Sequence, residues 1–105
     1  MDKRYKPLDR STQLQQRFDL RKHIEADPRI PISEAVRLIR NTLRLTIPDM
    51  SKVTRVAQRT IRNIESGKAN PSMQTLEQML QPFGYRLGIV PITPSDTDEN
   101  PPGNP

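Results

Sequence analysis

Residues that start and stop helices follow one another closely in the middle of the chain, and this succession most constrains the fold. Small polar residues suited to capping a helix recur at short intervals, and glycines stand where two of the helices would end. The pattern predicts four short helices joined by tight turns between residues 33 and 84. The expected caps are Ser33, Thr46 and Ser72, and the expected ends include Gly67 and Gly84.

The second and third of these helices have the spacing of a helix-turn-helix. The second is predicted to start at Thr46, where Asp49 three residues on completes a capping box. Pro48 is tolerated there because it falls in the first turn. A short break at 55–57 separates this helix from the third, which is expected over 58–65.

Apolar residues at helical spacing predict the core. Val36, Ile39 and Leu43 stand at i, i+3 and i+7 of the first helix, so they share one face. We interpret this set as core, with no cofactor implied. The inner residues expected in the later helices are Met50, Val53, Ile61, Ile64, Leu76, Met79, Leu80 and Phe83.

The periodicity changes after the last helix. Tyr85, Leu87 and Ile89 alternate with other residues until Pro91, which is typical of a short strand. A lone strand leaves backbone donors and acceptors unpaired, which is costly. The linker before the first helix is the only conceivable partner within the chain, and its proline suits a ladder poorly. We therefore predict that the strand pairs with its counterpart in a second copy, giving a homodimer.

The ends of the chain differ from its middle. Residues 1–32 form a basic extension with a helix predicted over 11–27, ending before Pro28. This extension is an arm over DNA, a protein-docking helix or simply an ordered addition, and the residues do not rank these alternatives. Residues 33–90 form the helical domain with its strand, and residues 91–105 are expected to be a disordered, acidic, proline-rich tail.

Charge is unevenly distributed along the chain. Lys and Arg number 17 against 12 Asp and Glu, for a net charge of +5. The last fifteen residues carry −3, so the rest of the chain carries +8. A basic body favours a polyanionic partner, most simply nucleic acid, although many basic surfaces are only solvated. The acidic tail is a solubilising segment or, alternatively, one that inhibits or binds a partner.

Several classes of function find no support in the residues. The chain has no cysteine and a single histidine, His23, so we expect no metal site and no cofactor. No nucleophile with a base, glycine-rich phosphate loop or carboxylate pair indicates an enzyme. The N-terminus lacks the apolar region of a signal peptide, and no run approaches membrane-spanning length. We expect a non-enzymatic, cytoplasmic and nucleoid-associated protein.

Residues 45–76 resemble, without gaps, the Cro/C1-type (Xre family) helix-turn-helix of transcriptional regulators. The most specific part runs from Thr60-Ile61 through Ile64-Glu65-Ser66-Gly67-Lys68 to Asn70-Pro71-Ser72 and Thr75-Leu76. The resemblance extends over roughly residues 33–90. Its ending, Phe83-Gly-Tyr-Arg-Leu-Gly-Ile-Val, is most similar to the HipB-like antitoxin branch, in which a strand after the helices builds an intermolecular sheet.

The resemblance implies an all-α, lambda-repressor-like bundle of four to five helices, with one short C-terminal strand pairing across a dimer. It also implies that the third helix reads base edges in the major groove. Gln and Asn suit adenine and Arg suits guanine, although a solvated helix face is the plainer interpretation. The positions matched to base contacts are Gln58, Arg59, Arg62 and Asn63. Those suited to phosphate contacts are Lys52, Arg55 and Lys68, and Arg40 and Glu65 match a structural ion pair.

The sequence departs from the family pattern at four positions. Ile47 stands where Gln usually contacts the DNA backbone, and Ile cannot donate that bond. Arg44 and Arg55 replace glycines, and Ala57 replaces the usual Ser cap of the recognition helix. Loss of that cap costs about 1 kcal/mol of helix stability. These changes affect the expected phosphate geometry more than the expected fold.

The function predicted from the sequence is sequence-specific binding of double-stranded DNA by a homodimeric transcriptional repressor on a palindromic operator. The resemblance implies an autoregulating antitoxin of a toxin–antitoxin pair, with a HipA-like kinase toxin as partner. Two alternatives remain open. One is a stand-alone phage or mobile-element repressor without a toxin, and the other is a protein-bridging adaptor that uses the helix-turn-helix domain as a docking surface.

Overall fold

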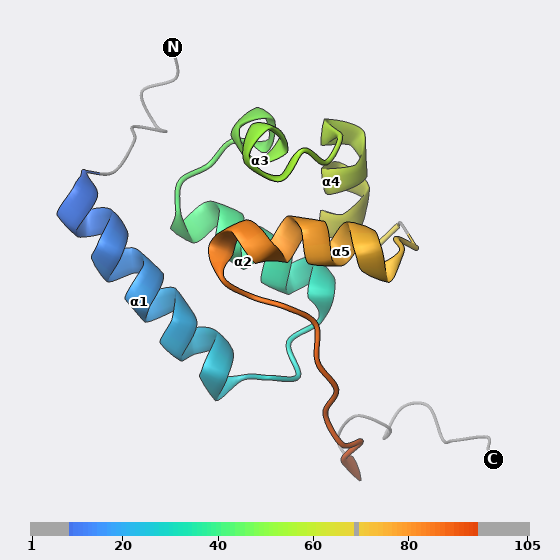
Figure 1. The fold of residues 1–105 in the computed structure, drawn as a ribbon. Helices are drawn as coiled ribbons and strands as arrows, with labels where there is room; N and C mark the ends of the chain where they lie inside the picture. The colour runs from blue at the N-terminus through green and yellow to red at the C-terminus, as the bar shows by residue number, and fades with distance from the viewer. Residues whose placement is uncertain (1–8, 69, 95–105) are drawn as a thin grey trace.

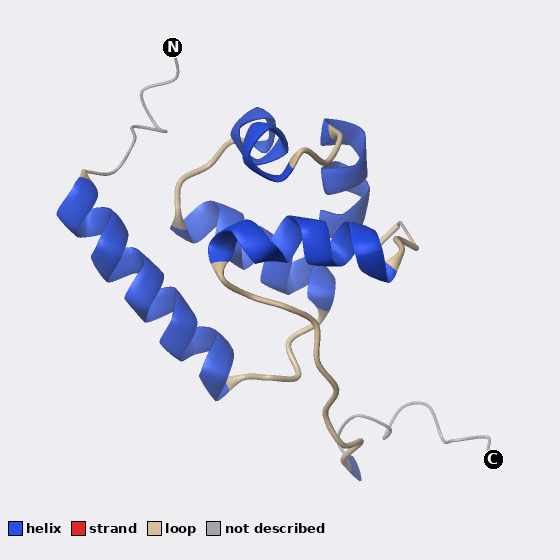
Figure 2. Cartoon of the chain, viewed as in Figure 1, coloured by secondary structure: helices blue, strands red, loops and turns tan. Residues whose placement is uncertain are grey.

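A computed structural model describes residues 9–68 and 70–94, and every regular element in these ranges is helical (Figures 1 and 2). The all-α prediction is therefore confirmed. The elements are α1 (Arg10–Ala26), α2 (Ile32–Thr42), α3 (Ile47–Thr54), α4 (Gln58–Glu65), α5 (Met73–Leu80) and a 3₁₀ turn (Gln81–Phe83).

The core lies where α2, α3, α4 and α5 meet. Helix α2 packs on α1 and α4, and α3 packs on α4 and α5. The core positions predicted from helical spacing are buried, with two differences at Val53 and Leu76. The largest fully buried side chains are Val36, Ile39, Met50, Ile61 and Met79.

The prediction of Val53 as a core residue is wrong. Its side chain is 50% exposed, and Leu76 is only half-buried. In the two-turn helix α3 the second inward position belongs to Thr54, which is 3% exposed. The Thr54 hydroxyl donates to the Met50 carbonyl at 2.7 Å, so a polar residue is buried there with its hydrogen bond satisfied.

Side-chain caps begin three of the helices. The predicted capping box of α3 is present: Asp49 N–H donates to Thr46 Oγ1, and Thr46 N–H donates to Asp49 Oδ2, each at 3.1 Å. The predicted Ser72 cap of α5 is also present, since Thr75 N–H donates to Ser72 Oγ at 3.0 Å. The N-cap of helix α1 is Asp9, whose carboxylate accepts from Thr12 N–H at 2.7 Å.

The predicted cap at Ser33 is wrong. Helix α2 begins two residues earlier than predicted, at Ile32, and its N-cap is Pro31, which makes no side-chain cap bond. The Pro31 carbonyl accepts from Ala35 N–H at 2.9 Å, and Ile32 packs against the core. Proline has a fixed φ, and Ile32 contacts the apolar residues of the core. The helix therefore starts before Ser33, although Ser33 has the better capping side chain.

Helix α1 occupies the segment predicted as an N-terminal helix and runs along one edge of the bundle (Figure 1). Leu20 and Ile24 pack against the core, while the outer residues Leu14 and Phe18 are 62% and 57% exposed. The Lys22 ammonium lies 5.2 Å from the centre of the Phe18 ring. The tail predicted to be disordered lies mostly outside the described residues, which end at Pro94.

The predicted strand at 85–90 does not form in the single chain: residues 70–94 contain no strand. Tyr85 and Leu87 point inward and are half-buried, but Ile89 is 99% exposed. The Leu87 N–H donates to the Glu77 carboxylate at 3.0 Å. A side chain, rather than a carbonyl of a second strand, therefore accepts this hydrogen bond. The segment is extended, and no neighbouring strand within the described residues completes a ladder.

The capping box makes the stability of α3 depend on pH. Hydrogen bonds from Thr46 hold the pKa of the Asp49 carboxyl below its usual value of 3.8. Because the folded pKa is the lower one, the stabilisation is fully present above about pH 4 and is lost as pH falls through the folded pKa. Asp49→Asn should lower the free energy of unfolding by about 0.3–1 kcal/mol at pH 6, and by less at pH 2.5.

Urea unfolding at both pH values measures this difference. Asp27→Asn is the control, because it removes an exposed carboxylate from outside any capping box. An equal loss of stability for Asp49→Asn at pH 6 and pH 2.5 would contradict the role given to its charge.

Candidate nucleic-acid interface

The turn between α3 and α4 is held by hydrogen bonds from side chains. Val56 N–H donates to Thr54 Oγ1 at 3.2 Å, and Ser51 Oγ donates to the Val56 carbonyl at 2.6 Å. Val56 itself is buried, 6% exposed, so the turn is also anchored in the core. These contacts fix the direction in which α4 leaves α3.

Helix α5 supports the same turn from the other side. The Gln78 amide donates to the carbonyls of Thr54 and Arg55 at 3.1 and 3.2 Å. These carbonyls belong to the C-terminal end of α3, where the helix itself supplies no donors. Sequence reasoning missed Gln78 and Ser51, because neither position stands out in the apolar periodicity.

Helix α4 has one buried and one exposed face. Ile61 and Ile64 are at most 2% exposed, and the Glu65 side chain is 9% exposed. The N-cap of the helix is Ala57, which makes no side-chain cap bond, as expected from the loss of the usual serine. The residues predicted to read bases are all exposed on the outer face: Gln58, Arg59, Arg62 and Asn63.

The buried face of α4 ends in an ion pair with α2. Arg40 Nε lies 2.7 Å from Glu65 Oε2, and Arg40 Nη2 lies 3.0 Å from Glu65 Oε1, so the pair is bidentate. Both side chains are largely buried. The remaining terminal nitrogen of Arg40 donates to the Leu45 carbonyl at 3.0 Å, and Arg37 donates to the Glu65 carbonyl at 3.2 Å. The structure thus brings together the two residues predicted as a structural pair.

The residues predicted to contact phosphates lie around α4. Lys52 and Arg55 stand on the α3 side, before its first residue, and Lys68 follows its last turn. All three are exposed, and among the described residues none takes part in an ion pair. Arg55 has a left-handed backbone with φ of 63°, which accounts for the glycine usual at this turn.

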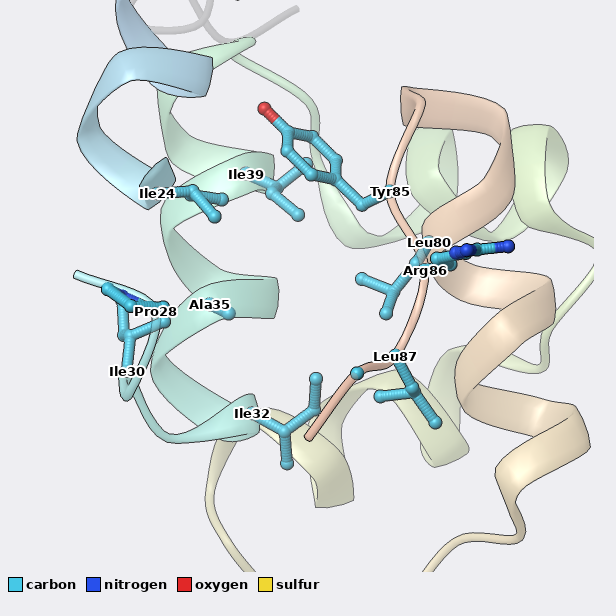
Figure 3. Close-up of a pocket in the computed structure, with 11 residues that line it drawn as sticks. Ile24, Pro28, Ile30, Ile32, Ala35, Ile39, Leu80, Tyr85, Arg86 and Leu87 are labelled. Atoms are coloured by element: carbon cyan, nitrogen blue, oxygen red, sulfur yellow. The ribbon is translucent and has the colours of Figure 1, made fainter. Parts of the chain in front are cut away.

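A shallow groove lies beside the C-terminal segment, away from α4 (Figure 3). It measures about 200 Å³ and separates the linker before α2 from residues 85–88. The Arg86 side chain points away from it, and burial raises the pKa of the Tyr85 hydroxyl. Most of the lining is apolar and includes Ile24, Pro28, Ile30, Ile32 and Leu87.

The described residues contain no cluster of three or more His, Cys, Asp or Glu side chains that could hold a metal ion. None of the helices in the same ranges is both long and apolar enough to cross a membrane.

Comparison with known proteins agrees with this geometry. The helix-turn-helix family matches residues 36–90, which contain α4, the turn before it and most of α2. The chain belongs to the Xre-type helix-turn-helix family. An uncharacterized HTH-type transcriptional regulator of Haemophilus influenzae is 31% identical over 78 residues, which are 74% of this chain and 80% of that protein. No solved structure matches the chain.

Family membership supports a coarse function, DNA-binding regulation, and the family is typically non-enzymatic. The family match begins within α2, so α1 lies outside it.

The buried Arg40–Glu65 pair gives a test of what positions α4. Glu65→Gln leaves a buried guanidinium without its counter-charge, so it should lower the free energy of unfolding by about 3 kcal/mol. Glu25→Gln is the matched control, because it breaks an exposed pair with Arg21 at 3.5 Å and should cost less than about 0.5 kcal/mol. Urea unfolding of both variants measures the difference, and equal small losses would contradict the structural role of the pair.

Proposed function

We propose that this chain is a transcriptional repressor that binds double-stranded DNA in a sequence-specific manner as a homodimer on a palindromic operator. The observation that carries this proposal is the division of α4 into two faces. Ile61, Ile64 and Glu65 are buried, while every polar side chain predicted to read bases is exposed. A helix anchored on one face can place the other against base edges in the major groove.

The exposed side chains of α4 have the chemistry that base edges require. Gln58 and Asn63 carry amides that can donate to and accept from adenine, and Arg59 can bridge the two acceptors of guanine. Arg62 can reach a base or a phosphate. An eight-residue helix is about 12 Å long, and the major groove is about 12 Å wide, so the whole exposed face fits within it.

Three cations would position α4 on the duplex without reading sequence. Lys52, Arg55 and Lys68 are exposed, and each can bind a phosphate oxygen. Such contacts release counterions, so binding should weaken steeply as salt concentration rises.

The homodimer is proposed to form through residues 85–90. This segment is extended, with Tyr85 and Leu87 inward and Ile89 exposed, and it has no strand partner among the described residues. Ile89 within this segment and Ile92 just after it are 99% and 77% exposed, so two large apolar side chains face solvent. Pairing with the same segment of a second copy across a two-fold axis would satisfy the backbone and cover these side chains.

The biological context we propose is an autoregulating antitoxin that binds a HipA-like kinase toxin in the cytoplasm. The similarity of residues 83–90 to the HipB-like branch supports it. A stand-alone repressor would use the same DNA chemistry without a toxin.

The adaptor hypothesis has one observation in its favour, the exposed Leu14 and Phe18 on α1. Copurification of a kinase-like partner would favour the antitoxin over the stand-alone repressor. Loss of a partner on Phe18→Ala would place the docking surface on α1.

Base reading and phosphate binding predict different mutant behaviour. Arg59→Ala should cost about 1–3 kcal/mol of binding free energy on the operator and relax the preference at one base position. Lys68→Ala should weaken binding to all sequences alike and reduce the salt slope by about 1. Dissociation constants on operator variants and on random duplex, at several salt concentrations, measure both effects. If the two variants behave alike on specific and random DNA, Arg59 does not read a base.

If the chain dimerises through residues 85–90, a single substitution there should lower its mass in solution from dimer to monomer. Ile89→Asp should dissociate the dimer, because it places a charge in the shared apolar surface. Ile89 is 99% exposed in the single chain, so this variant keeps the fold, whereas Leu87→Asp also disturbs a half-buried side chain. Met73→Asp, at a residue 72% exposed on α5, is the control. Light scattering reports the mass, and a dimeric Ile89→Asp variant would refute strand pairing.

A further inference from the structure

Arg44 has a strained backbone that no contact of its own side chain accounts for. It lies between α2 and α3 with φ of 57°, in the left-handed region that L side chains rarely adopt. Its N–H donates to the Asn41 carbonyl at 3.1 Å. Its side chain is exposed and makes no hydrogen bond or ion pair with any described residue. Strain of this kind often marks a functional position.

The turn that holds Arg44 is linked to the C-terminal end of α4 through the side chain of Arg40. One guanidinium, that of Arg40, contacts both the Leu45 carbonyl at 3.0 Å and the Glu65 carboxylate at 2.7 Å. Arg37 also donates to the Glu65 carbonyl, at 3.2 Å. The residue after Arg44 and the last residue of α4 are therefore joined through a single side chain.

Exposed cations consequently stand at both ends of α4. Lys52 and Arg55 precede its first residue and Lys68 follows its last turn, while Arg44 lies in the turn that Arg40 joins to its last residue. A helix in the major groove has a phosphate backbone on either side, so cations at both ends can each reach one. Within the turn before α3, Leu45 carries no side-chain donor and Thr46 carries a neutral hydroxyl that caps α3, so the guanidinium of Arg44 is the exposed cation able to bind a phosphate there.

We propose that Arg44 contacts the DNA backbone. The chain keeps an arginine with a left-handed backbone conformation at this turn because its guanidinium binds a phosphate. The proposal rests on the DNA-binding function proposed above and adds a residue to its interface. It predicts that stability and DNA affinity move in opposite directions when Arg44 is replaced.

Two substitutions separate the effect of the backbone conformation of Arg44 from the effect of its charge. Arg44→Asn removes the charge and introduces a residue that tolerates the left-handed conformation, so the midpoint of thermal unfolding should rise by a few degrees. The same variant should weaken binding to operator and random duplex by one common factor, and reduce the salt slope by about 0.9 per protomer. Arg44→Lys keeps both the charge and the strain, so it should retain most of the slope without the gain in stability.

Arg21→Ala is the control for total charge, because it removes one exposed cation of α1. It should change the salt slope less than Arg44→Asn does. The proposal is overturned if Arg44→Asn leaves affinity and slope unchanged, if its unfolding midpoint does not rise, or if Arg21→Ala lowers the slope equally. If the wild-type chain binds no duplex at all, the proposed function itself fails, and this result is distinct from the others.

Discussion

The bidentate contact between Arg40 and Glu65 is the interaction on which the arrangement of the helices depends. It joins α2 to the end of α4, and the same guanidinium holds the Leu45 carbonyl in the turn before α3. Because both charges are largely buried, each requires the other, and loss of either leaves an uncompensated charge. One interaction therefore sets the positions of three segments, and with them the exposed face of α4.

A second set of contacts completes this support at the other end of α4. Gln78 of α5 and Ser51 of α3 bind carbonyls of the short turn at 54–56. Together the two ends leave α4 little freedom to move relative to the core, so its outer side chains are held in a fixed geometry. Such preorganisation is what a base-reading surface requires, since loosely held side chains would discriminate poorly between bases.

Much of the fold was predictable because local rules decided it. The Thr46–Asp49 box, the Ser72 cap and the bounds of α4 follow from capping chemistry and apolar spacing, and the structure confirms them. The prediction failed at Ser33 and Val53, where packing prevailed over local preference. The partners of the turn carbonyls, Gln78 above all, could not be predicted, because they depend on which helices meet. The strand at 85–90 stays a prediction, since it needs a second chain.

We propose above all that the exposed face of α4 reads a DNA sequence. Unbiased selection of duplex DNA by the purified chain at two salt concentrations tests it most directly. We expect a palindromic consensus with half-sites about 10 base pairs, or 34 Å, apart and a steep loss of binding at the higher salt. Binding without sequence preference, or no binding at either salt concentration, would contradict the claim and favour a protein-docking role for the helix-turn-helix domain.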